Sequence, residues 1–356
     1  MAKKRVLVVD DSALVRKQLG ELLEKNGYEV DFAKNGKVGL QKAVESDFNV
    51  VTMDINMPIM DGITSLEEIM KQNPTPVIMV SSLVSADAEP TMKAFELGAI
   101  DCIAKPGTSN VGLKDNGDEL LKLIKSASRI SKRRMAKTAL NLQSRTKPRE
   151  RTPKEINQKV TTKKVPASSI VLIGSSTGGP SVLEELCSVL PADFPHAVCI
   201  VQHMPEKFIA AFAQRLDKVS SLEVKEAEHN EELYSGVVYI AKGGIHMHFR
   251  KKVSGKIVIR LEESVVSRFF TPSVDEMYFS ALEVFKPKDM FAIILTGIGD
   301  DGADGMVALK KAGVHTLGES EETATVYGMP KEAYLRGGVS EKLPFDKILQ
   351  RIRTYR

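Results

Sequence analysis

The sequence predicts an α/β protein built from two doubly wound units, and three observations support this. The chain has 356 residues, about twice the length of an ordinary domain. Short runs rich in Val, Leu and Ile alternate with amphipathic stretches, as in parallel sheets covered by helices on both faces. This alternation stops at a basic segment and then restarts. We therefore expect two domains, residues 1–124 and 167–356, joined by a linker over 125–166.

In the first unit, five apolar runs predict the strands of one parallel sheet. RVLVVD (5–10) is the first, and the apolar spacing after it predicts a helix over 12–27 that Gly27 closes. The other runs, in chain order, are YEVDFA, FNVVTMD, PVIMVSS (76–82) and AIDCIAKP (99–106). Ligands of such sheets bind at the carboxyl ends of the strands, so polar residues that follow these runs are candidates for a site.

In the second unit, the pattern restarts at SSIVLIGSSTGGP (168–180) with a strand, a Gly-rich turn and the start of a helix. PHAVCIVQHMP (195–205) and KDMFAIILTGIGDDGADGM (288–306) predict two more buried strands, each followed by polar residues. VYIAKG and HMHFRKKVSGKIVIRL predict a β-rich insert between these two strands. The polar residues that follow the strands again mark the candidate site.

The formal net charge of +4 is unevenly distributed. From Lys122 to Lys164 the chain has 15 Lys and Arg and two acids, a net of +13, which leaves −9 for the rest. Because this segment has few large apolar residues, the sequence predicts a solvated, self-repelling linker. Attraction to an acidic surface, such as a receptor or nucleic acid, is the alternative. The basic residues have no aromatic residues among them, which argues against nucleic acid.

Composition also limits the class and the location of the protein. With 42% hydrophobic and 27% charged residues, the chain is neither disordered nor fibrous. No apolar run approaches the roughly 18 residues of a membrane span, and VLVV after the basic N-terminus is too short for a signal peptide. The three cysteines, Cys102, Cys187 and Cys199, lie far apart, as expected for reduced thiols. We expect a cytoplasmic protein that does not insert into a membrane.

Three carboxylates are expected to converge in the first unit. Asp10 and Asp11 end the first strand and Asp54 ends the third, and these strands are neighbours in the expected sheet. Carboxylates this close need a cation or a proton between them, and Mg²⁺ suits an all-oxygen ligand set. Ser81 and Lys105 end the next two strands and reach the same pocket. Together these groups can stabilise a phosphoryl group during transfer to an aspartate.

An alternative is that such side chains only cap helices, as Asp11 or Ser12 would. The matches VVDDS, MDINMP, VSS and KP favour a site, because on them residues 1–124 resemble a response-regulator receiver domain, which has a flavodoxin-like sheet. The resemblance implies that Asp54 is phosphorylated with the help of Mg²⁺. It implies four metal ligands and two phosphoryl-sensing residues: Asp10, Asp11, Asp54 and the carbonyl of Asn56, then Ser81 and Lys105. Cys102 stands where receivers usually have an aromatic switch residue.

The Gly-rich turn of the second unit carries three hydroxyl side chains, Ser175, Ser176 and Thr177. A phosphate cradle is one interpretation, but the turn lacks the Lys of a P-loop and the GxGxxG order. A serine on a strand-to-helix turn is also placed for nucleophilic attack. His203 and Asp301 follow two later strands, so a nucleophile, a base and an orienting acid would meet at one edge of the sheet. The order Ser, His, Asp differs from that of α/β-hydrolases.

The motifs GSSTGGP, VQHMP, VYIAKGGIHM, TPSVDEMY, LTGIGDDGADGM and VYGMPKEA occur in this order, and on them residues 167–350 resemble the catalytic domain of chemotaxis protein-glutamate methylesterases. The resemblance implies a nucleophile, a base, an orienting acid and two oxyanion or support residues: Ser176, His203, Asp301, Thr177 and Ile298. It selects Asp301 over the adjacent Asp300. Ile298 stands where the family usually has Met, and Thr271 where a basic or imidazole side chain is common.

The implied function is phosphorylation-activated hydrolysis of glutamate methyl esters on chemoreceptor helices, with deamidation of glutamines by the same geometry. A chemotaxis histidine kinase would be the phosphodonor, and the esterase reaction itself would need no cofactor. Two other classes remain open: a receiver–effector binding module without hydrolysis, and a DNA-binding regulator. Retention of all three relay residues disfavours the first, and the α/β pattern of the second unit, which is not helix-turn-helix, disfavours the second.

Overall fold

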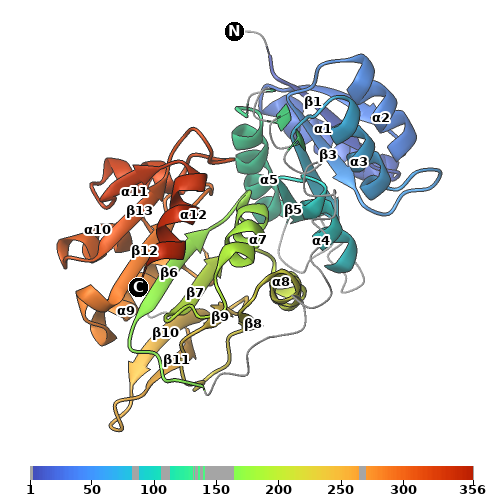
Figure 1. The fold of residues 1–356 in the computed structure, drawn as a ribbon. Helices are drawn as coiled ribbons and strands as arrows, with labels where there is room; N and C mark the ends of the chain where they lie inside the picture. Colours follow the sequence, from blue (N-terminus) through green and yellow to red (C-terminus); the bar gives the residue numbers. More distant parts are fainter. Residues whose placement is uncertain are drawn as a thin grey trace. The chain divides into compact units, whose positions relative to one another are not determined.

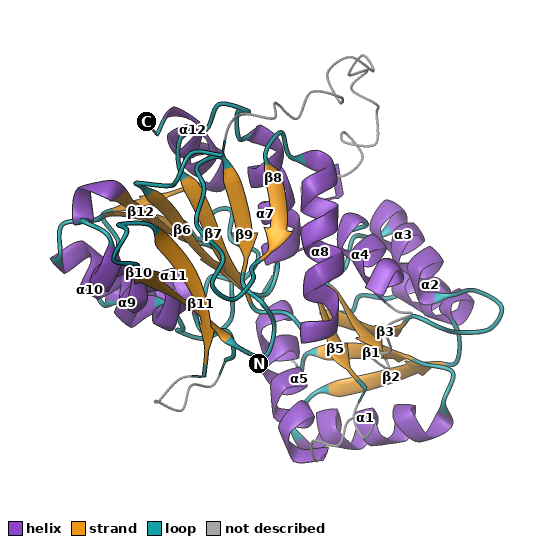
Figure 2. Cartoon of the chain, turned by 90° about the horizontal axis from the view of Figure 1, so that it is seen from below, coloured by secondary structure: helices purple, strands orange, loops and turns teal. Residues whose placement is uncertain are grey.

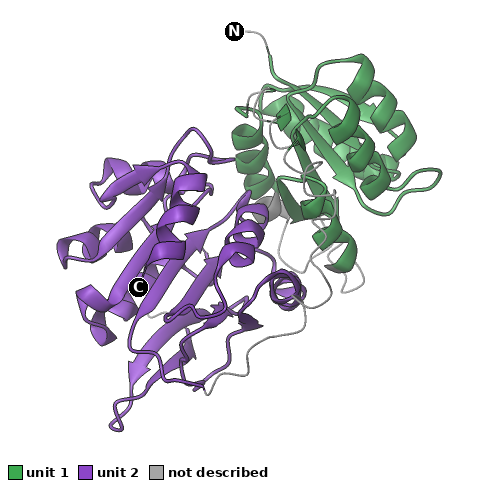
Figure 3. Ribbon diagram, in the orientation of Figure 1, with its two compact units in different colours: residues 1–150 green, residues 151–356 purple. Residues whose placement is uncertain are grey.

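The chain divides into two compact units, residues 1–150 and 151–356, in a computed structural model (Figures 1 and 3). The structure describes residues 3–81, 88–105, 113–130, 132, 135–136, 139–140, 164–263 and 270–355. Most of the expected linker, including residues 141–163, lies outside the described residues, so its boundaries at 125 and 166 stay predictions. Each unit is described by itself.

The first unit is a five-stranded sheet in the order β2-β1-β3-β4-β5, with all neighbouring strands parallel. Its strands are β1 Arg5–Val9, β2 Glu29–Ala33, β3 Val50–Asp54, β4 Val77–Ser81 and β5 Asp101–Ala104. Its helices are α1 Ala13–Lys25, α2 Gly36–Glu45, α3 Gly62–Gln72, α4 Ala88–Glu96 and α5 Leu113–Ala127. The prediction of a flavodoxin-like five-stranded parallel sheet is therefore confirmed.

Short polar side chains begin three of these helices. The side chains of Ser12, Asn35 and Asp61 accept hydrogen bonds from backbone N–H groups in the first turns of α1, α2 and α3. Ser12 is thus the residue that caps α1. Asp11 is not the capping residue, so its carboxylate is available for a different role. The strands are rich in Val, Ile and Met, and β3 and β4 are buried along their whole length, as a sheet covered on both faces requires.

The second unit is a seven-stranded, fully parallel sheet in the order β14-β13-β12-β6-β7-β9-β8 (Figure 2). Its strands are β6 Ile170–Ser175, β7 Ala197–Gln202, β8 Glu223–Glu226, β9 Val237–Ile240, β12 Met290–Ile294, β13 His315–Glu319 and β14 Glu341–Leu343. A separate antiparallel hairpin consists of β10 His246–Lys251 and β11 Ile257–Glu262. The prediction of a second doubly wound α/β unit is confirmed.

Helices cover this sheet in two groups. The helices are α7 Gly179–Val189, α8 Glu206–Val219, α9 Val274–Val284, the short 3₁₀ turn η2 Pro287–Asp289, α10 Ala303–Lys311, α11 Met329–Leu335 and α12 Phe345–Thr354. In one group α7 contacts both α8 and α12, and in the other α10 contacts both α9 and α11. Helix α9 also packs on hairpin strand β10, so the hairpin is held against the sheet through a shared core.

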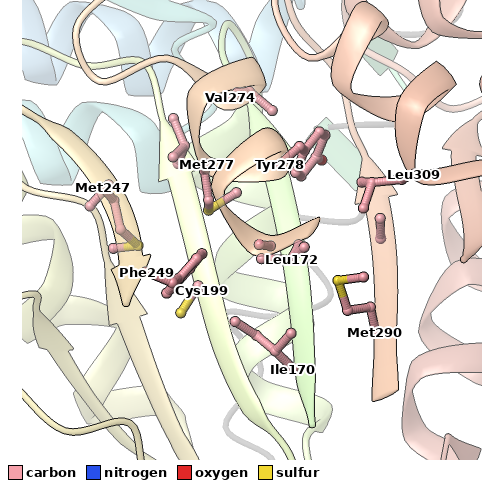
Figure 4. Close-up of a cluster of buried hydrophobic side chains, with 14 of the residues drawn as sticks. Ile170, Leu172, Cys199, Met247, Phe249, Val274, Met277, Tyr278, Met290 and Leu309 are labelled. Carbon is pink, nitrogen blue, oxygen red and sulfur yellow. The ribbon is translucent and has the colours of Figure 1, made fainter. Parts of the chain in front are cut away.

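The core around α9 is formed by side chains from the sheet, the hairpin and two helices. Figure 4 shows α9 lying over the central strands, with the hairpin beside it. The labelled members of this core are Ile170, Leu172, Cys199, Met247, Phe249, Val274, Met277, Tyr278, Met290 and Leu309. Because the first turn of α9 belongs to this core, the position of its N-terminus relative to β6 and β12 is fixed by packing.

The expected β-rich insert is only partly right. VYIAKG was assigned to it, but β9 joins the main sheet between β7 and β8, and only β10 and β11 form a separate hairpin. The physical reason is that the run VVYI is buried at every position, which suits an interior parallel strand. The short polar strands β8 and β14 carry no such apolar run, so the sequence did not reveal them.

Both sheets reverse their direction of growth next to their first strand. In the first unit the chain builds β2 on one side of β1 and then β3 on the other. In the second unit it builds outward from β6 through β7 to β8 and then returns to place β12 on the opposite side. Crevices outside the carboxyl ends of strands at such reversal points are where open α/β sheets bind ligands.

Candidate functional site

An acidic cluster lies at the reversal point of the first unit. Asp10 directly follows β1, Asp54 ends the neighbouring β3, and the carboxylates of Asp10, Asp11 and Asp54 each offer an oxygen within 4.8 Å of the others. Asp10 and Asp54 are buried, whereas Asp11 is exposed. A set of three carboxylates has the hard oxygen donors that divalent cations such as Mg²⁺ take. These residues fit a cation site.

Lys105, which directly follows β5, joins the two buried carboxylates. Its ammonium nitrogen lies 3.0 Å from Asp10 Oδ2 and 2.7 Å from Asp54 Oδ2. Burial raises the pKa of Asp54, and it outweighs the opposing hydrogen bond and charge of Lys105. Burial lowers the pKa of Lys105, but the hydrogen bonds and charges of Asp54 and Asp10 outweigh it and raise that pKa. The lysine is therefore held charged against the carboxylate that ends β3.

The other two predicted residues of this site, Ser81 and Asn56, lie near Lys105 and Asp54 through backbone contacts. Ser81 ends β4 and is fully buried, and its carbonyl accepts a hydrogen bond of 2.7 Å from the N–H of Lys105. Asn56 follows Ile55, whose N–H donates to Asp54 Oδ1 at 2.8 Å. A Cβ at Gly62 would lie 1.9 Å from the Asp54 carbonyl oxygen, so only glycine fits behind the aspartate. The structure brings together the strand ends named from the sequence.

Cys102 occupies the interior of β5 at the predicted switch position. Its side chain is 4% exposed, and its sulfur lies 3.9 Å from the Thr91 hydroxyl. No aromatic ring stands at this position, so a switch that works by rotating a ring is not available there.

A histidine–aspartate pair lies at the reversal point of the second unit. His203 directly follows β7, Asp301 lies in the loop after β12, and His203 Nε2 is 2.8 Å from Asp301 Oδ2. An ionised carboxylate only accepts hydrogen bonds, so Nε2 carries a proton, and in the neutral ring this is its only proton. The other ring nitrogen, Nδ1, is buried and has no hydrogen-bond partner among the described residues. The nitrogen with the available lone pair is thus Nδ1.

The carboxylate of Asp301 rests on the N-terminus of α9. Its Oδ1 accepts hydrogen bonds from the Ser273 hydroxyl at 2.7 Å and from the Asp275 N–H at 3.2 Å. Its Oδ2 accepts a further one from the Val274 N–H at 2.7 Å. Burial raises the pKa of Asp301, but the hydrogen bond and charge of His203, together with these donors, outweigh it, so the pKa is lowered. A charged carboxylate therefore faces the imidazole.

Ser176 lies in the turn between β6 and α7 and is tied to His203 through Gln202. The side-chain amide of Gln202 donates to the carbonyls of Ser176 and His203 at 2.9 and 2.8 Å. Its side-chain oxygen accepts the Ser175 hydroxyl at 2.7 Å, so this neighbouring serine is engaged in the interior. A Cβ at Gly179 would lie 1.9 Å from that oxygen, which explains why the turn needs glycine there. Of the two serines, Ser176 is the one whose hydroxyl is not used by Gln202.

The loop after β12 passes beside Ser176. The Ser176 N–H donates to the Thr296 carbonyl at 3.0 Å, and a Cβ at Gly297 would lie 2.9 Å from Ser176 Cβ. Because the Ser176 N–H is already bonded, a donor for an oxyanion has to come from neighbouring residues. The two predicted from the sequence are near: Thr177 is 3% exposed and accepts the Thr296 hydroxyl through its carbonyl, and half-buried Ile298 follows Gly297.

Sequence reasoning missed several residues of this site. Phe270 stacks on the His203 ring with centroids 4.0 Å apart and planes at 13°. Ser273, Val274 and Gln202 make the hydrogen bonds described above. The motif TPSVDEMY contains Ser273 and Val274, and VQHMP contains Gln202, but neither motif shows which loop these residues meet, and Phe270 lies outside both.

Asp275 gives the second unit a pH-dependent stability. Burial, supported by the charges of Asp301 and Asp304, raises the pKa of Asp275 from 3.8 to about 6. The folded state thus holds an extra proton in this window, and stability is lost as the pH rises through it, by up to about 2–3 kcal/mol.

Asp275→Asn keeps an oxygen for the Gly305 N–H, which now donates at 2.7 Å. Urea unfolding followed by circular dichroism from pH 4 to 7 should show a smaller loss in this variant than in the wild type. Parallel pH dependences would contradict the assignment.

The two folds and their sites define a signalling protein in which a receiver precedes an α/β unit with hydrolase-type side chains. The family model for the CheB methylesterase matches residues 171–352, and that for the response regulator receiver domain matches residues 6–127. The chain belongs to the CheB methylesterase family and has a receiver domain at its amino-terminal side.

Named relatives extend over nearly the whole chain. A protein-glutamate methylesterase/protein-glutamine glutaminase 2 of Carboxydothermus hydrogenoformans is 44% identical over 99% of both chains. A protein-glutamate methylesterase/protein-glutamine glutaminase of Archaeoglobus fulgidus is 43% identical over 98% of this chain and 97% of its own. The crystal structure of the Thermotoga maritima CheB methylesterase catalytic domain, 40% identical, covers 52% of this chain and 98% of its own with a TM-score of 0.50. Both units are thus shared with methylesterases.

Proposed function

We propose that this chain is a phosphorylation-activated protein-glutamate methylesterase, in which Ser176, His203 and Asp301 form the catalytic relay. The observation that carries the proposal is the buried His203–Asp301 pair, tied to Ser176 through Gln202 at the reversal point of the sheet. Family membership supplies the reaction class, and the His203–Asp301 pair supports the proposed roles. The substrate class is the methyl ester of a glutamate side chain on a chemoreceptor helix.

The reaction follows the general course of acyl transfer. Ser176 Oγ attacks the ester carbonyl while His203 Nδ1 takes its proton, and Asp301 stabilises the imidazolium through Nε2–H. Backbone donors near Thr177 and Ile298 stabilise the oxyanion, worth about 2.7–4 kcal/mol for each donor in comparable sites. The imidazolium then protonates the departing methoxide, and methanol leaves. Water attacks the acyl enzyme with the help of Nδ1, which frees the glutamate and restores Ser176.

The same relay serves for deamidation of a glutamine side chain. The acyl enzyme is identical, and only the leaving group differs, since ammonia departs where methanol did. Nothing in the relay itself distinguishes the two substrates, so selection between them depends on the surface that binds the receptor helix.

The acidic cluster of the receiver supplies the regulation. Asp54 accepts the phosphoryl group from a chemotaxis histidine kinase, and Asp10, Asp11, Asp54 itself and the Asn56 carbonyl would hold Mg²⁺. When bound, Mg²⁺ neutralises the charge that develops on the phosphoryl oxygens. Lys105 already bridges the two buried carboxylates, so it is placed to bind a phosphoryl oxygen once Asp54 is modified. Ser81 senses the same group from the end of β4.

Three further parts of the proposal concern organisation and location. The receiver comprises residues 1–124 and the catalytic domain residues 167–356, joined by the basic linker 125–166. None of the described helices has both the length and the apolar content needed to cross a bilayer. We place the enzyme in the cytoplasm, where it acts on the cytoplasmic helices of chemoreceptors without binding nucleic acid.

Phosphorylation at Asp54 is expected to stimulate methanol release from methylated receptor membranes. With Mg²⁺ and acetyl phosphate, wild-type protein should gain at least about tenfold in rate, which requires only about 1.4 kcal/mol of differential stabilisation. Asp54→Asn should show no stimulation, because its amide cannot accept a phosphoryl group. Asp31→Asn, which removes an acid from the middle of β2, is the matched control and should respond like the wild type. Equal stimulation of Asp54→Asn would contradict the assignment, and receptor binding without methanol release by the wild type would favour the binding-module alternative.

A further inference from the structure

A second chain of hydrogen bonds continues from the relay of the second unit toward the hairpin. The Ser273 hydroxyl donates to Asp301 Oδ1 at 2.7 Å, and the Ser273 N–H donates to His246 Nδ1 at 3.1 Å. His246 begins β10 and is 3% exposed, and Ser273 is fully buried. His246, Ser273, Asp301 and His203 are therefore linked in the interior by consecutive contacts of 3.1 Å or less, the first of which uses the Ser273 backbone N–H.

The bond to Ser273 fixes the state of the His246 ring. Because a backbone N–H only donates, His246 Nδ1 has to accept, and a neutral ring with the proton on Nε2 meets this requirement. Ser273 is also the residue that precedes α9, so His246 holds the backbone at the point from which three donors reach Asp301. A shift of Ser273 would move all three donors together.

The neighbouring histidine of the hairpin has no such link. His248 lies on the same strand, with its ring stacked 6.2 Å from that of His246, and its Nε2 contacts Glu276 at 3.2 Å. Its other nitrogen lies 3.6 Å from Glu262. His248 is thus a histidine of the same strand, more exposed than His246, that touches neither Ser273 nor Asp301 in any contact the structure shows, and it serves as the control.

We propose that His246 and Ser273 are positioning residues that hold Asp301, and through it His203, in the orientation required for proton transfer. The inference rests on the proposed esterase function and assigns to the hairpin a part in the reaction. Neither residue touches the reacting atoms. Their contribution is to keep the carboxylate aimed at Nε2, so that Nδ1 stays the nitrogen that can accept a proton.

Paired substitutions separate positioning from folding. His246→Leu and Ser273→Ala remove the acceptor and the hydroxyl. His246→Asn supplies an amide oxygen as the acceptor in place of Nδ1, and Ser273→Thr keeps the hydroxyl. Ser273→Ala should lower kcat for methanol release about tenfold, the usual effect of losing one hydrogen bond to a charged group, with KM little changed. His246→Leu should lower kcat in the same direction, because it releases the Ser273 backbone from which the donors reach Asp301. The second pair should restore most of kcat, and His248→Leu should match the wild type.

Non-additivity gives the sharper test. If the two residues act through Asp301, adding His246→Leu or Ser273→Ala to Asp301→Asn should lower kcat less than about twofold further. An equal loss in both backgrounds would overturn the proposal, as would wild-type kcat in folded His246→Leu or Ser273→Ala protein.

The imidazole N–H proton of His203, observed by NMR, provides a readout without turnover: its signal should shift or broaden in the first pair and persist in the second. A wild-type protein that releases no methanol would count against the esterase function alone, and the NMR comparison would still decide the positioning role.

Discussion

Replacing Ser176 with alanine is expected to lower kcat for methanol release about a millionfold, the loss seen when the nucleophile of a serine hydrolase is removed. The proposed mechanism requires an acyl enzyme on this oxygen. The adjacent hydroxyl cannot substitute, because Ser175 is fully buried and donates to Gln202. Methanol release from methylated receptor membranes, with and without acetyl phosphate, measures the effect in both states of the receiver.

Ser175→Ala is the matched control for this substitution. It removes the neighbouring hydroxyl and loosens Gln202 but leaves the proposed nucleophile, so it should retain measurable turnover. Thermal unfolding of both variants would show that the fold is kept. Undiminished release by Ser176→Ala would reject the assignment, and a selective loss in Ser175→Ala would move the nucleophile to that position.

The second large effect is expected for Asp301→Asn, about ten-thousandfold in kcat, as for the corresponding change in a serine protease relay. An amide has no charge to stabilise the imidazolium. The wild-type carboxylate accepts hydrogen bonds from Ser273, Val274 and His203. The NH₂ group of an asparagine is itself a donor, so it would face these donors without being able to accept from them. The side chain would therefore lose both its charge and its fixed orientation.

The adjacent carboxylate provides the control, Asp300→Asn. Asp300 is 61% exposed and pairs with Arg336, away from the imidazole. Its removal should change the free energy of unfolding by no more than about 0.5 kcal/mol, as is usual at exposed positions, and should leave kcat close to that of the wild type. A larger loss for Asp300→Asn than for Asp301→Asn would contradict the geometry of the pair.

The alternation of apolar runs was enough to predict the five strands of the first sheet and β6, β7 and β12 of the second, because a parallel strand buried on both faces leaves a continuous apolar run in the sequence. β1, β3, β6 and β7 have this character, and each was predicted. Strands β8 and β14 could not be found in the same way, since EVKE and EKL are polar edge segments whose pairing depends on the neighbour they meet. The position of β9 in the sheet could not be predicted either, because it depends on which neighbouring strands are available for pairing.

The site residues that could be predicted differ from those that could not for a similar physical reason. Residues at strand ends, such as Asp54 and His203, could be predicted, since parallel strands bring their carboxyl ends to one edge. Ser273 could not, because its contact with Asp301 depends on how α9 packs between the hairpin and the sheet. Gln202 was also missed: its role lies in bridging two carbonyls, which no spacing in the sequence reveals.

The reversal of the seven-stranded sheet at β6 also bears on how activity would return after denaturation. His203 follows the first strand of one wing of the sheet, and Asp301 follows the first strand of the opposite wing, about a hundred residues later in the chain. Neither wing alone contains a base with its orienting acid. Recovered esterase turnover would therefore report completed refolding of this unit, and it should lag behind regain of helical signal.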